Sequence, residues 1–533
     1  MEININKPER KKVEQMMIVG TVIFVLVIIA VISGAMKANY HLDEYLTYVL
    51  ANSSNGSKIQ LQEGVAYTGD DAFMDYFTVQ RGHEFDYATV WKNQSEDVHP
   101  PLYYVFVHTI SSFFPGSFSK WFGLAVNILF YILSGIFVYM ISARLFRDRI
   151  KALIILIIWG TSAGILNTVV FIRMYMMVSF FILAAIYLHL DLYKRKRPGI
   201  KFYTLLFLTT VGGGLTHYYF VVFIFFTAFY YVIFLLVQKR FRDLLLYIVT
   251  YLLSAGTAIL IFPSMIDQVF FGYRGEAAFE AMESNSNFLN TIFQYASIII
   301  SKTMGYSLIF FLILAAGILL IIRRFKISGI KRGMRKIFRH PASAMFLVSI
   351  MYFLVIARIA PYITDRYIAP IFGLVYIVVF TVLLKILCLL KMKENRKYLF
   401  MIITGAVLLP LTWSHGIENL YLNRQEGVRI AEENSNLDVI FVYDGKIWKL
   451  CPDIKELDKY HSFTVLKKEN LENYFQESNL EGSESYVVYI LYTLDQEEIL
   501  SQIRTADKDI STVEILYDPG DSASYAASYL ILQ

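Results

Sequence analysis

The sequence predicts an α-helical polytopic membrane protein with a small α/β domain at its carboxyl end. Of its 533 residues, 56% are hydrophobic and only 17% are charged, which is more apolar surface than a water-soluble core of this size requires. Apolar runs long enough to cross a bilayer recur along the first 414 residues, and short basic segments separate them. The remaining residues alternate between strand and helix patterns.

The apolar runs and the basic segments between them predict the topology. The first run, residues 16–35, follows a basic leader at 7–12 and lacks a small-residue cleavage site, so we expect an uncleaved anchor with a cytoplasmic amino terminus. Further runs follow at 120–142, 152–170, 174–190, 202–215, 219–237, 244–262, 305–322, 342–356, 368–390 and 398–413.

Six basic clusters hold 29 of the 49 lysines and arginines, and they fall at every second membrane boundary. Because these residues stay on the cytoplasmic side of short loops, the pattern predicts about eleven full crossings, and about eleven to thirteen transmembrane helices in all. It also predicts that the carboxyl terminus is extracytoplasmic. We expect the protein to lie in the plasma membrane.

Residues 99–114 do not fit this alternation, because the run is short and starts with two prolines. A full crossing would place the basic cluster at 144–151 outside, so we expect a re-entrant or membrane-lying helix here. Residues 288–303 form a second apolar run that could lie along the outer surface.

Two segments are polar. The first outer loop, residues 37–98, is longer than a connector requires, which indicates a function. We predict a transmembrane domain over 1–414 that includes this loop, and a small extracytoplasmic α/β domain over 415–533. Within the tail the patterns predict strands at 437–443, 485–492, 512–517 and 525–532 and helices at 469–477 and 495–505.

Charge and cysteine content exclude some classes. The tail carries 22 acidic and 10 basic residues, whereas a nucleic-acid partner would need a clustered cationic surface. The two cysteines, Cys388 and Cys451, define no disulfide framework. No residues have metal-ligand spacing, so no cofactor is firmly implied, although a divalent ion at Asp43 and Asp97 is left open.

Ionisable side chains near membrane depth are costly, so each one is a functional candidate. The first is the pair Asp43-Glu44, a few residues beyond the first apolar run. Adjacent side chains on a helix point about 100° apart, so we expect one of the two to face an inner cavity. A carboxylate there is suited to deprotonate a hydroxyl acceptor. A solvated pair or a helix cap is the structural alternative.

A second candidate is the segment from Glu96 to Tyr104, in which two prolines follow His99. Prolines are tolerated at a helix start, so we expect Asp97 and His99 at the mouth of the short apolar run, with Tyr103 in the helix that follows. A simple helix start explains the segment equally well.

Arg173 and Tyr175 lie at a turn that the charge rule places outside. A lone guanidinium in an otherwise unbroken apolar hairpin is suited to a lipid-linked phosphate, which it can bind through two hydrogen bonds. The alternative is an arginine that reaches to lipid headgroups.

Two more outer turns carry candidates. His217, with Tyr218 beside it, is suited to bind phosphate or a sugar hydroxyl, or is an interfacial histidine. Arg366, between Asp365 and Tyr367, is suited to phosphate, or forms a plain surface pair with its neighbouring aspartate.

In order along the chain, the acidic pair, His-Pro-Pro-Leu-Tyr-Tyr, Arg-Met-Tyr, Thr-His-Tyr-Tyr and Asp-Arg-Tyr resemble the GT-C superfamily of membrane glycosyltransferases. The resemblance covers roughly residues 16–414 and lies with the branch of the protein O-mannosyltransferases and the lipid A aminoarabinose transferase. It implies an outward-facing active site, a polyprenyl-phosphate sugar as donor, and Asp43 as the catalytic base with Glu44 beside it. The tail has no counterpart in the resemblance.

The resemblance and the charges together assign the donor site and the partners. We expect a polyprenyl-phosphate-linked sugar, a lipid, polymer or protein acceptor, and membrane lipids as partners, and no nucleic acid. The donor-binding residues would be Asp97, His99, Tyr103, Arg173, Tyr175, His217, Tyr218, Arg366 and Tyr367.

The expected reaction is transfer of the sugar, with inversion, to an acceptor hydroxyl or amine at the outer face. A transporter or flippase of lipid-linked precursors is the alternative, because it could use the same arginines without a base. Transporters usually place polar groups at the bilayer midplane and often show internal repeats, and neither is evident here. A catalytically inactive scaffold is a third alternative, which Asp43 argues against.

Overall fold

The computed structural model describes residues 7–69, 71–194, 197–283, 288–328, 340–477, 485–507, 509–520 and 525–533. The chain forms two compact units. The helical unit comprises the residues up to Gly34, Asp97–Tyr103 and Leu124–Ile417, and the α/β unit comprises Ala35–Glu96, Tyr104–Gly123 and Glu418–Gln533. The first outer loop and the tail, which the sequence analysis assigned to different domains, therefore belong to one unit.

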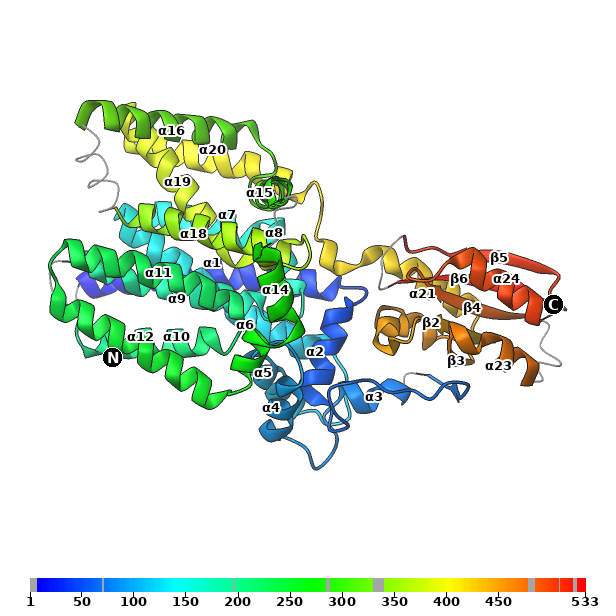
Figure 1. The fold of residues 1–533 in the computed structure, drawn as a ribbon. Helices are drawn as coiled ribbons and strands as arrows, with labels where there is room; N and C mark the ends of the chain where they lie inside the picture. Colours follow the sequence, from blue (N-terminus) through cyan, green and yellow to red (C-terminus); the bar gives the residue numbers. More distant parts are fainter. Residues whose placement is uncertain are drawn as a thin grey trace, which may run out of the picture. The chain divides into compact units, whose positions relative to one another are not determined.

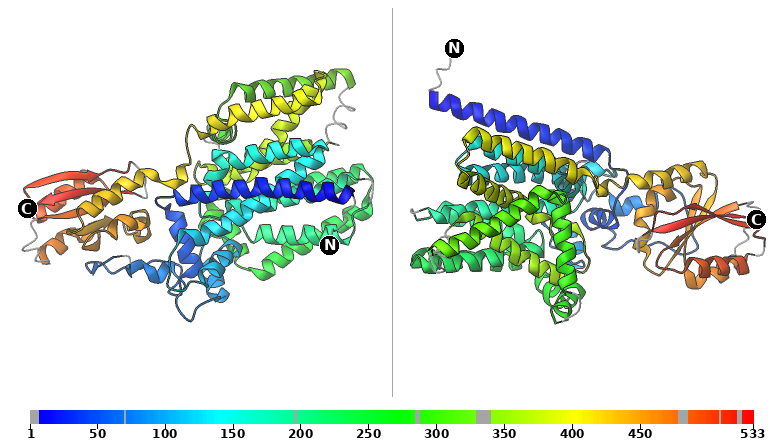
Figure 2. Two further views of the ribbon diagram at one scale, coloured as in Figure 1. Left: turned by 180° about the vertical axis from the view of Figure 1, so that it is seen from behind. Right: turned by 90° about the horizontal axis from the view of Figure 1, so that it is seen from above.

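The helical unit is built from long apolar helices whose axes run side by side (Figures 1 and 2). Its α-helices are α1 (Lys7–Ala35), α6 (Lys120–Phe146), α7 (Arg149–Thr161), α8 (Ala163–Val170), α9 (Tyr175–His189), α10 (Ile200–Gly214), α11 (Tyr218–Val237), α12 (Phe241–Ile261), α13 (Met265–Phe270), α14 (Tyr273–Glu283), α15 (Phe288–Met304), α16 (Leu308–Ser328), α18 (Pro341–Ile359), α19 (Phe372–Leu389) and α20 (Glu394–Trp413). Its 3₁₀ helices are η1 (Leu190–Tyr193), η2 (Asp365–Tyr367) and η3 (Ala369–Ile371).

Among the described residues, seven helices are long and apolar enough to cross a membrane, or up to ten if each bent pair counts as one span. This count is lower than the predicted eleven to thirteen, partly because α10 has only 15 residues. The α5 helix (Leu102–Ser111) has 10 residues, too few to cross a hydrocarbon core of roughly 30 Å at about 1.5 Å per residue. The seven or more long apolar helices make the chain a multi-pass membrane protein.

Large apolar side chains cover the outside of this unit. Leu252 and Leu260 on α12 are 68% and 82% exposed, and Phe225 on α11 is 61% exposed. Such a surface is unfavourable in water and matches lipid tails. Inside, bulky rings such as Trp159, Tyr352 and Tyr376 are fully buried.

Two of the long apolar segments are broken. The axes of α7 and α8 differ by 56°, and those of α15 and α16 differ by 114°. The α15 helix therefore lies across the direction of its neighbours (Figure 1). Breaks of this kind free backbone groups inside the fold, which other side chains must bond.

The α/β unit contains a six-stranded mixed sheet in the order β1-β3-β2-β4-β6-β5. Strand β2 pairs in parallel with β3 and β4, and the other pairs are antiparallel. The strands are β1 (Ala66–Tyr67), β2 (Asp438–Tyr443), β3 (Ser462–Lys467), β4 (Ser485–Leu491), β5 (Thr512–Tyr517) and β6 (Ala526–Leu532). Its helices are α2 (Leu42–Asn52), α3 (Asp71–Phe77), α4 (Tyr87–Ser95), most of α5, α21 (Gln425–Glu433), α22 (Ile454–Leu457), α23 (Leu471–Glu477) and α24 (Gln496–Ala506), with η4 (Glu418–Leu420), η5 (Leu422–Arg424), η6 (Ile447–Asp453) and η7 (Lys468–Asn470).

The four strands and two helices predicted in the tail are confirmed, each within two residues of its predicted bounds. Two strands were not predicted. Five of the six residues of β3 are buried, so the strand lacks the alternation that marks a half-exposed strand. Strand β1 comes from the polar loop over residues 37–98 and pairs only Ala66 and Tyr67 with β3.

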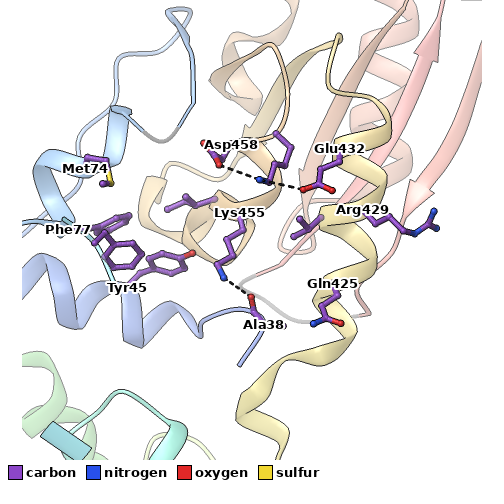
Figure 3. Close-up of a pocket in the computed structure, with 13 residues that line it drawn as sticks. Ala38, Tyr45, Met74, Phe77, Gln425, Arg429, Glu432, Lys455 and Asp458 are labelled. Atoms are coloured by element: carbon purple, nitrogen blue, oxygen red, sulfur yellow. Dashed lines mark hydrogen bonds and ion pairs between the residues drawn. The ribbon is translucent and has the colours of Figure 1, made fainter. Parts of the chain in front are cut away.

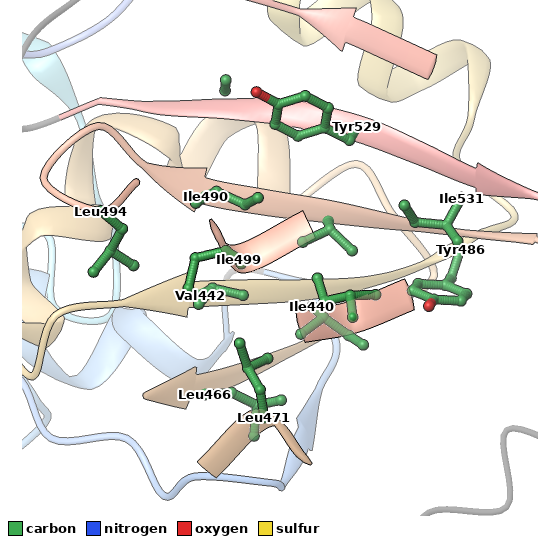
Figure 4. Close-up of a cluster of buried hydrophobic side chains, with 13 residues drawn as sticks. Ile440, Val442, Leu466, Leu471, Tyr486, Ile490, Leu494, Ile499, Tyr529 and Ile531 are labelled. Atoms are coloured by element: carbon green, nitrogen blue, oxygen red, sulfur yellow. The ribbon is translucent and has the colours of Figure 1, made fainter. Parts of the chain in front are cut away.

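The core of the sheet is apolar. Ile440, Val442, Val488 and Ile490 of the central strands pack against α24, which contributes Ile499 and other side chains (Figure 4). Burial of these side chains supplies about 1.5–3 kcal/mol each. This packed sheet supports the loop over residues 37–98, which pairs with its strand β3.

One charged cluster lies inside this unit. The guanidinium of Arg424 pairs with both Asp453 and Glu456, and all three side chains are 1% exposed or less. Because one arginine cannot neutralise two buried carboxylates, burial raises the pKa of both acids despite Arg424.

We expect the α/β unit to lose stability as the pH rises. A carboxyl whose pKa is raised in the folded state binds a proton that the unfolded chain has already released. Between the ordinary carboxyl pKa and the raised values, each step up in pH therefore favours unfolding. Thermal unfolding of the full-length protein in detergent, measured from about pH 5 to about pH 8, should show this slope.

The variant Glu456→Gln should flatten the slope, whereas Glu469→Gln, which changes an exposed acid, should keep it. An unchanged slope in Glu456→Gln would mean that other groups dominate the pH dependence.

Candidate functional site

The predicted base lies at the start of α2, in the α/β unit. His41 caps this helix: its Nδ1 accepts the backbone N–H of Asp43 at 3.0 Å, and Glu44 Oε2 accepts the backbone N–H of His41 at 2.6 Å. Such a reciprocal cap satisfies two backbone donors that the helix itself leaves open. The cap holds both acidic residues in a defined orientation.

The structure separates the two neighbouring acids. Glu44 is fully buried, and Lys37 Nζ donates to its Oε2 at 3.0 Å. Lys37 also donates to the carbonyl of Asn419 at 2.6 Å, which ties the start of α2 to the tail segment of the same unit. Asp43 keeps a side chain that is 26% exposed, 3.7 Å from His41 Nδ1. The geometry gives Glu44 a structural task and leaves Asp43 accessible.

The predicted donor residues lie in the helical unit, where helices begin or break. Asp97 Oδ2 accepts a hydrogen bond from His99 Nδ1 at 3.0 Å. One guanidinium nitrogen of Arg173 lies 3.4 and 3.5 Å from the two ring nitrogens of His99. Burial alone would raise the pKa of Asp97, but His99 and the charge of Arg173 outweigh it and lower that pKa. Asp97 is therefore an ionised partner for this pair.

Arg173 is buried in the turn between α8 and α9. A buried amide holds this turn: Asn127 Nδ2 on α6 donates to the carbonyls of Val169 and Phe171 at 2.9 and 2.6 Å. The hydroxyl of Tyr103 donates to Asn127 Oδ1 at 3.0 Å. Asn127 thus satisfies carbonyls that the helix break releases, and it positions the backbone that carries Arg173.

His217 caps α11 and lies beside the same cluster. Its ring centroid is 5.4 Å from that of His99 and 5.5 Å from that of Tyr175. Its Nδ1 accepts the backbone N–H of Tyr219 at 3.0 Å, and its Nε2 is buried with no hydrogen-bond partner among the described residues. Burial lowers the pKa of His217, and the charges of His99, Arg173 and Arg366 lower it further. A neutral His217 therefore carries its proton on Nε2.

Arg366 lies in the 3₁₀ helix η2. Its guanidinium lies over two rings, 5.8 Å from the centroid of Phe171 and 5.2 Å from that of Tyr367. The neighbouring Asp365 accepts a hydrogen bond from Asn167 Nδ2 at 2.8 Å. The buried amide of Asn127 thus bonds the turn that carries Arg173, and the buried amide of Asn167 bonds the segment that carries Arg366.

The structure gathers most of the predicted donor residues. Tyr175 and Tyr367, 6.2 Å apart by ring centroid, connect the rings around His217 to Arg366. Tyr103 and Tyr218 bond protein partners, Asn127 and Gln268. Asp43 and Glu44 belong to the α/β unit. The described residues include no group of three or more His, Cys, Asp or Glu side chains that could hold a metal ion.

Sequence reasoning missed Asn127 and Asn167. Both are buried amides inside apolar runs, at 1% exposure or less. A polar amide in a run that is otherwise apolar is costly unless it is bonded, and this cost is a signal that the sequence does carry.

We expect Asn127→Leu to weaken donor binding, although Asn127 is not itself a predicted donor residue; the variant also removes the acceptor of the Tyr103 hydroxyl. The variant leaves the carbonyls of Val169 and Phe171 without their donor, at a cost of about 1–3 kcal/mol each, so the turn with Arg173 shifts. The measurement is the KM for a lipid-linked sugar together with the thermal midpoint. Ser134→Ala, on the same helix, is the control, because the Ser134 hydroxyl has no bond partner among the described residues. Equal KM values in Asn127→Leu and the wild type would refute the positioning role.

The helical fold and the cation–histidine cluster define a multi-pass membrane protein suited to hold an anionic group where its helices break. Residues 98–282 match the family model described as dolichyl-phosphate-mannose-protein mannosyltransferase. No curated protein matches the chain at a significant level.

Among solved structures, ArnT from Cupriavidus metallidurans bound to undecaprenyl phosphate is similar, with a TM-score of 0.51, 11% identity, and coverage of 96% of this chain and 97% of that one. The oligosaccharyltransferase AglB from Archaeoglobus fulgidus, in complex with an inhibitory peptide and a dolichol-phosphate, has a TM-score of 0.46 and 11% identity, covering 92% of this chain and 72% of that one. The family match is confined to residues 98–282, and the ArnT structure shows a similar fold over almost the whole chain.

Proposed function

We propose that this protein transfers a sugar from a polyprenyl-phosphate donor to a hydroxyl or amine of an acceptor at the outer face of the membrane, with inversion. The observation that carries the proposal is the cluster of Arg173, His99, His217 and Arg366 at the helix breaks. A phosphate placed there would meet two guanidinium groups and a buried imidazole N–H. The ArnT structure contains such a lipid phosphate.

In the proposed reaction, Asp43 takes the proton of the acceptor hydroxyl or amine. The freed lone pair attacks the anomeric carbon as the bond from that carbon to the phosphate oxygen breaks, so the configuration inverts. The lipid phosphate leaves with the electron pair, and it needs no strong acid because Arg173 and Arg366 hold its negative charge.

His99 and His217 have different tasks in this proposal. Asp97 orients His99 through its Nδ1, so that Arg173 packs against a fixed ring. His217, neutral because of its lowered pKa, donates from Nε2 to a phosphate oxygen. A neutral donor stabilises the anion without repelling the two arginines as a further cation would.

The charge pattern of the loops supports an orientation in which the amino terminus is cytoplasmic and this chemistry faces outside a plasma membrane. A transporter of lipid-linked precursors would use the same cations, but it would leave Asp43 without a task.

The deciding experiment is a transfer assay in proteoliposomes with a polyprenyl-phosphate sugar. Release of the free lipid phosphate together with a sugar-bearing acceptor supports the proposal. Movement of the intact donor across the bilayer without release would establish the transporter instead.

A further inference from the structure

A cavity of about 440 Å³ lies within the α/β unit, between α2, α3 and the tail helices α21 and α22 (Figure 3). One wall is aromatic: the ring centroids of Tyr45 and Phe77 are 5.1 Å apart, and those of Phe77 and Phe118 are 5.2 Å apart. The opposite wall mixes polar side chains, such as Gln425 and Lys455, with the apolar Val428 and Ile454. A cavity with rings on one side and polar groups on the other has the character of a sugar site.

Lys455 differs from the other cations that line this cavity because its ammonium group bonds to a backbone carbonyl and not to a carboxylate. Its Nζ donates to the carbonyl of Ala38 at 2.7 Å and lies 5.1 Å from the ring centroid of Tyr40. Within the described residues no carboxylate lies in ion-pair distance of it. Burial lowers the pKa of Lys455 to about 8, and Lys120 and Lys37 add to the effect.

The other charged groups at the cavity are already compensated. Lys459 lies 3.5 Å from Glu432 and 3.9 Å from Asp458. The guanidinium of Arg429 points away from the cavity and pairs with two exposed glutamates (Figure 3). The cavity therefore presents one ammonium group, that of Lys455, with no ion-pair partner among the described residues; the buried carboxylate of Glu44 acts on it only from farther away.

A second polar group in the wall also lacks a partner. Tyr45 is 1% exposed, and its hydroxyl has no hydrogen-bond partner among the described residues. Figure 3 shows this hydroxyl on the side of the ring that faces Lys455. A buried hydroxyl without a partner costs free energy, which a ligand that bonds to it would recover.

We propose that this cavity is a subsite for the acceptor and that it binds a sugar or polyol unit bearing a phosphate or a carboxylate. The anionic group would bond to Lys455 and the Tyr45 hydroxyl, and the carbon face of the unit would lie on the aromatic wall. Gln425, Asp458 and Glu432 would bond its hydroxyls. The inference rests on the proposed function, because it treats the sugar acceptor as a substrate of this enzyme.

The cavity wall and the predicted base Asp43 share helix α2, so their spacing indicates which part of the acceptor the cavity would hold. Asp43 precedes Tyr45 by two residues, which is about 3 Å along the helix axis and about 200° around it. A group in the cavity therefore does not lie at the base itself. The subsite holds a unit next to the one that receives the sugar, as in an extended anionic glycan.

The test measures binding of glucose 6-phosphate, glucuronate and glucose to the full-length protein in detergent, by titration calorimetry without a donor. We expect both anionic sugars to bind at least about tenfold more tightly than glucose, the gain of a charge-assisted hydrogen bond. Lys455→Gln should abolish the preference, Lys455→Arg should keep it, and Lys446→Gln, which changes an exposed lysine outside the cavity, should leave it unchanged.

A second measurement uses the wild-type protein, so it does not require that any variant folds. Acylation of Lys455 by an amine-reactive reagent, followed by mass spectrometry of the wild-type protein, should be slowed by glucose 6-phosphate and not by glucose. Equal affinity for the three sugars, or no protection of Lys455, overturns the proposal. Because no donor is present, failure here leaves transfer through Asp43 standing, and failure of transfer leaves this binding result standing.

Discussion

Asp43→Asn is expected to abolish sugar transfer while the protein still inserts and folds. The amide has nearly the same shape as the carboxylate but cannot accept the acceptor's proton, and general bases contribute about 10²–10⁴ in rate. Asp43 is partly exposed, and its backbone, rather than its carboxylate, takes part in the helix cap. The measurement is the initial rate of transfer in proteoliposomes, with the thermal midpoint recorded beside it.

Glu44→Gln is the matched comparison, because the two acids are neighbours with different surroundings. Glu44 is buried and accepts from Lys37 Nζ and from the backbone N–H of His41. Its neutralisation leaves Lys37 buried without its charge partner, which costs about 3–5 kcal/mol. We expect Glu44→Gln to lower the thermal midpoint. Full activity in Asp43→Asn would contradict the assignment, and Glu44 and Asp97 would then be the bases to test.

Arg173→Ala and Arg366→Ala should each weaken donor binding and slow transfer, because the leaving phosphate loses one of its two cations. Removal of a single preorganised group that stabilises developing charge costs about 10²–10³ in kcat. Arg173 is buried, so the loss of its charge falls in surroundings where water replaces it poorly. The measurements are the Kd for a lipid-linked sugar and single-turnover transfer rates.

Arg144→Ala is the control for these variants. Arg144 pairs with Asp191 at 3.0 Å and lies over the ring of Tyr187, in the same unit but at a basic segment that the charge rule places inside. Its loss should leave donor affinity unchanged. Wild-type affinity in both Arg173→Ala and Arg366→Ala would exclude a phosphate site between them.

The candidate site was found in the sequence because charge is costly next to a membrane. Arg173, His217 and Arg366 each interrupt apolar runs, and the structure places their side chains in one cluster with His99. Their roles, and that of Asp43, stay predictions that the experiments above decide. The amides that hold the cluster were missed because a single asparagine in an apolar run changes its hydropathy little.

Fold class and four of the five described strands of the tail follow from the sequence alone, because apolar run length, loop charge and strand patterns are properties of neighbouring residues. Only the tertiary structure decides the rest. It shows that β1, from the loop over residues 37–98, joins the tail sheet, and that Glu44 is buried against Lys37 while Asp43 beside it is partly exposed. It also shows that Asn127 bonds a turn more than 40 residues away. Pairing and burial of this kind depend on which distant segments meet, and no local pattern in the chain records that.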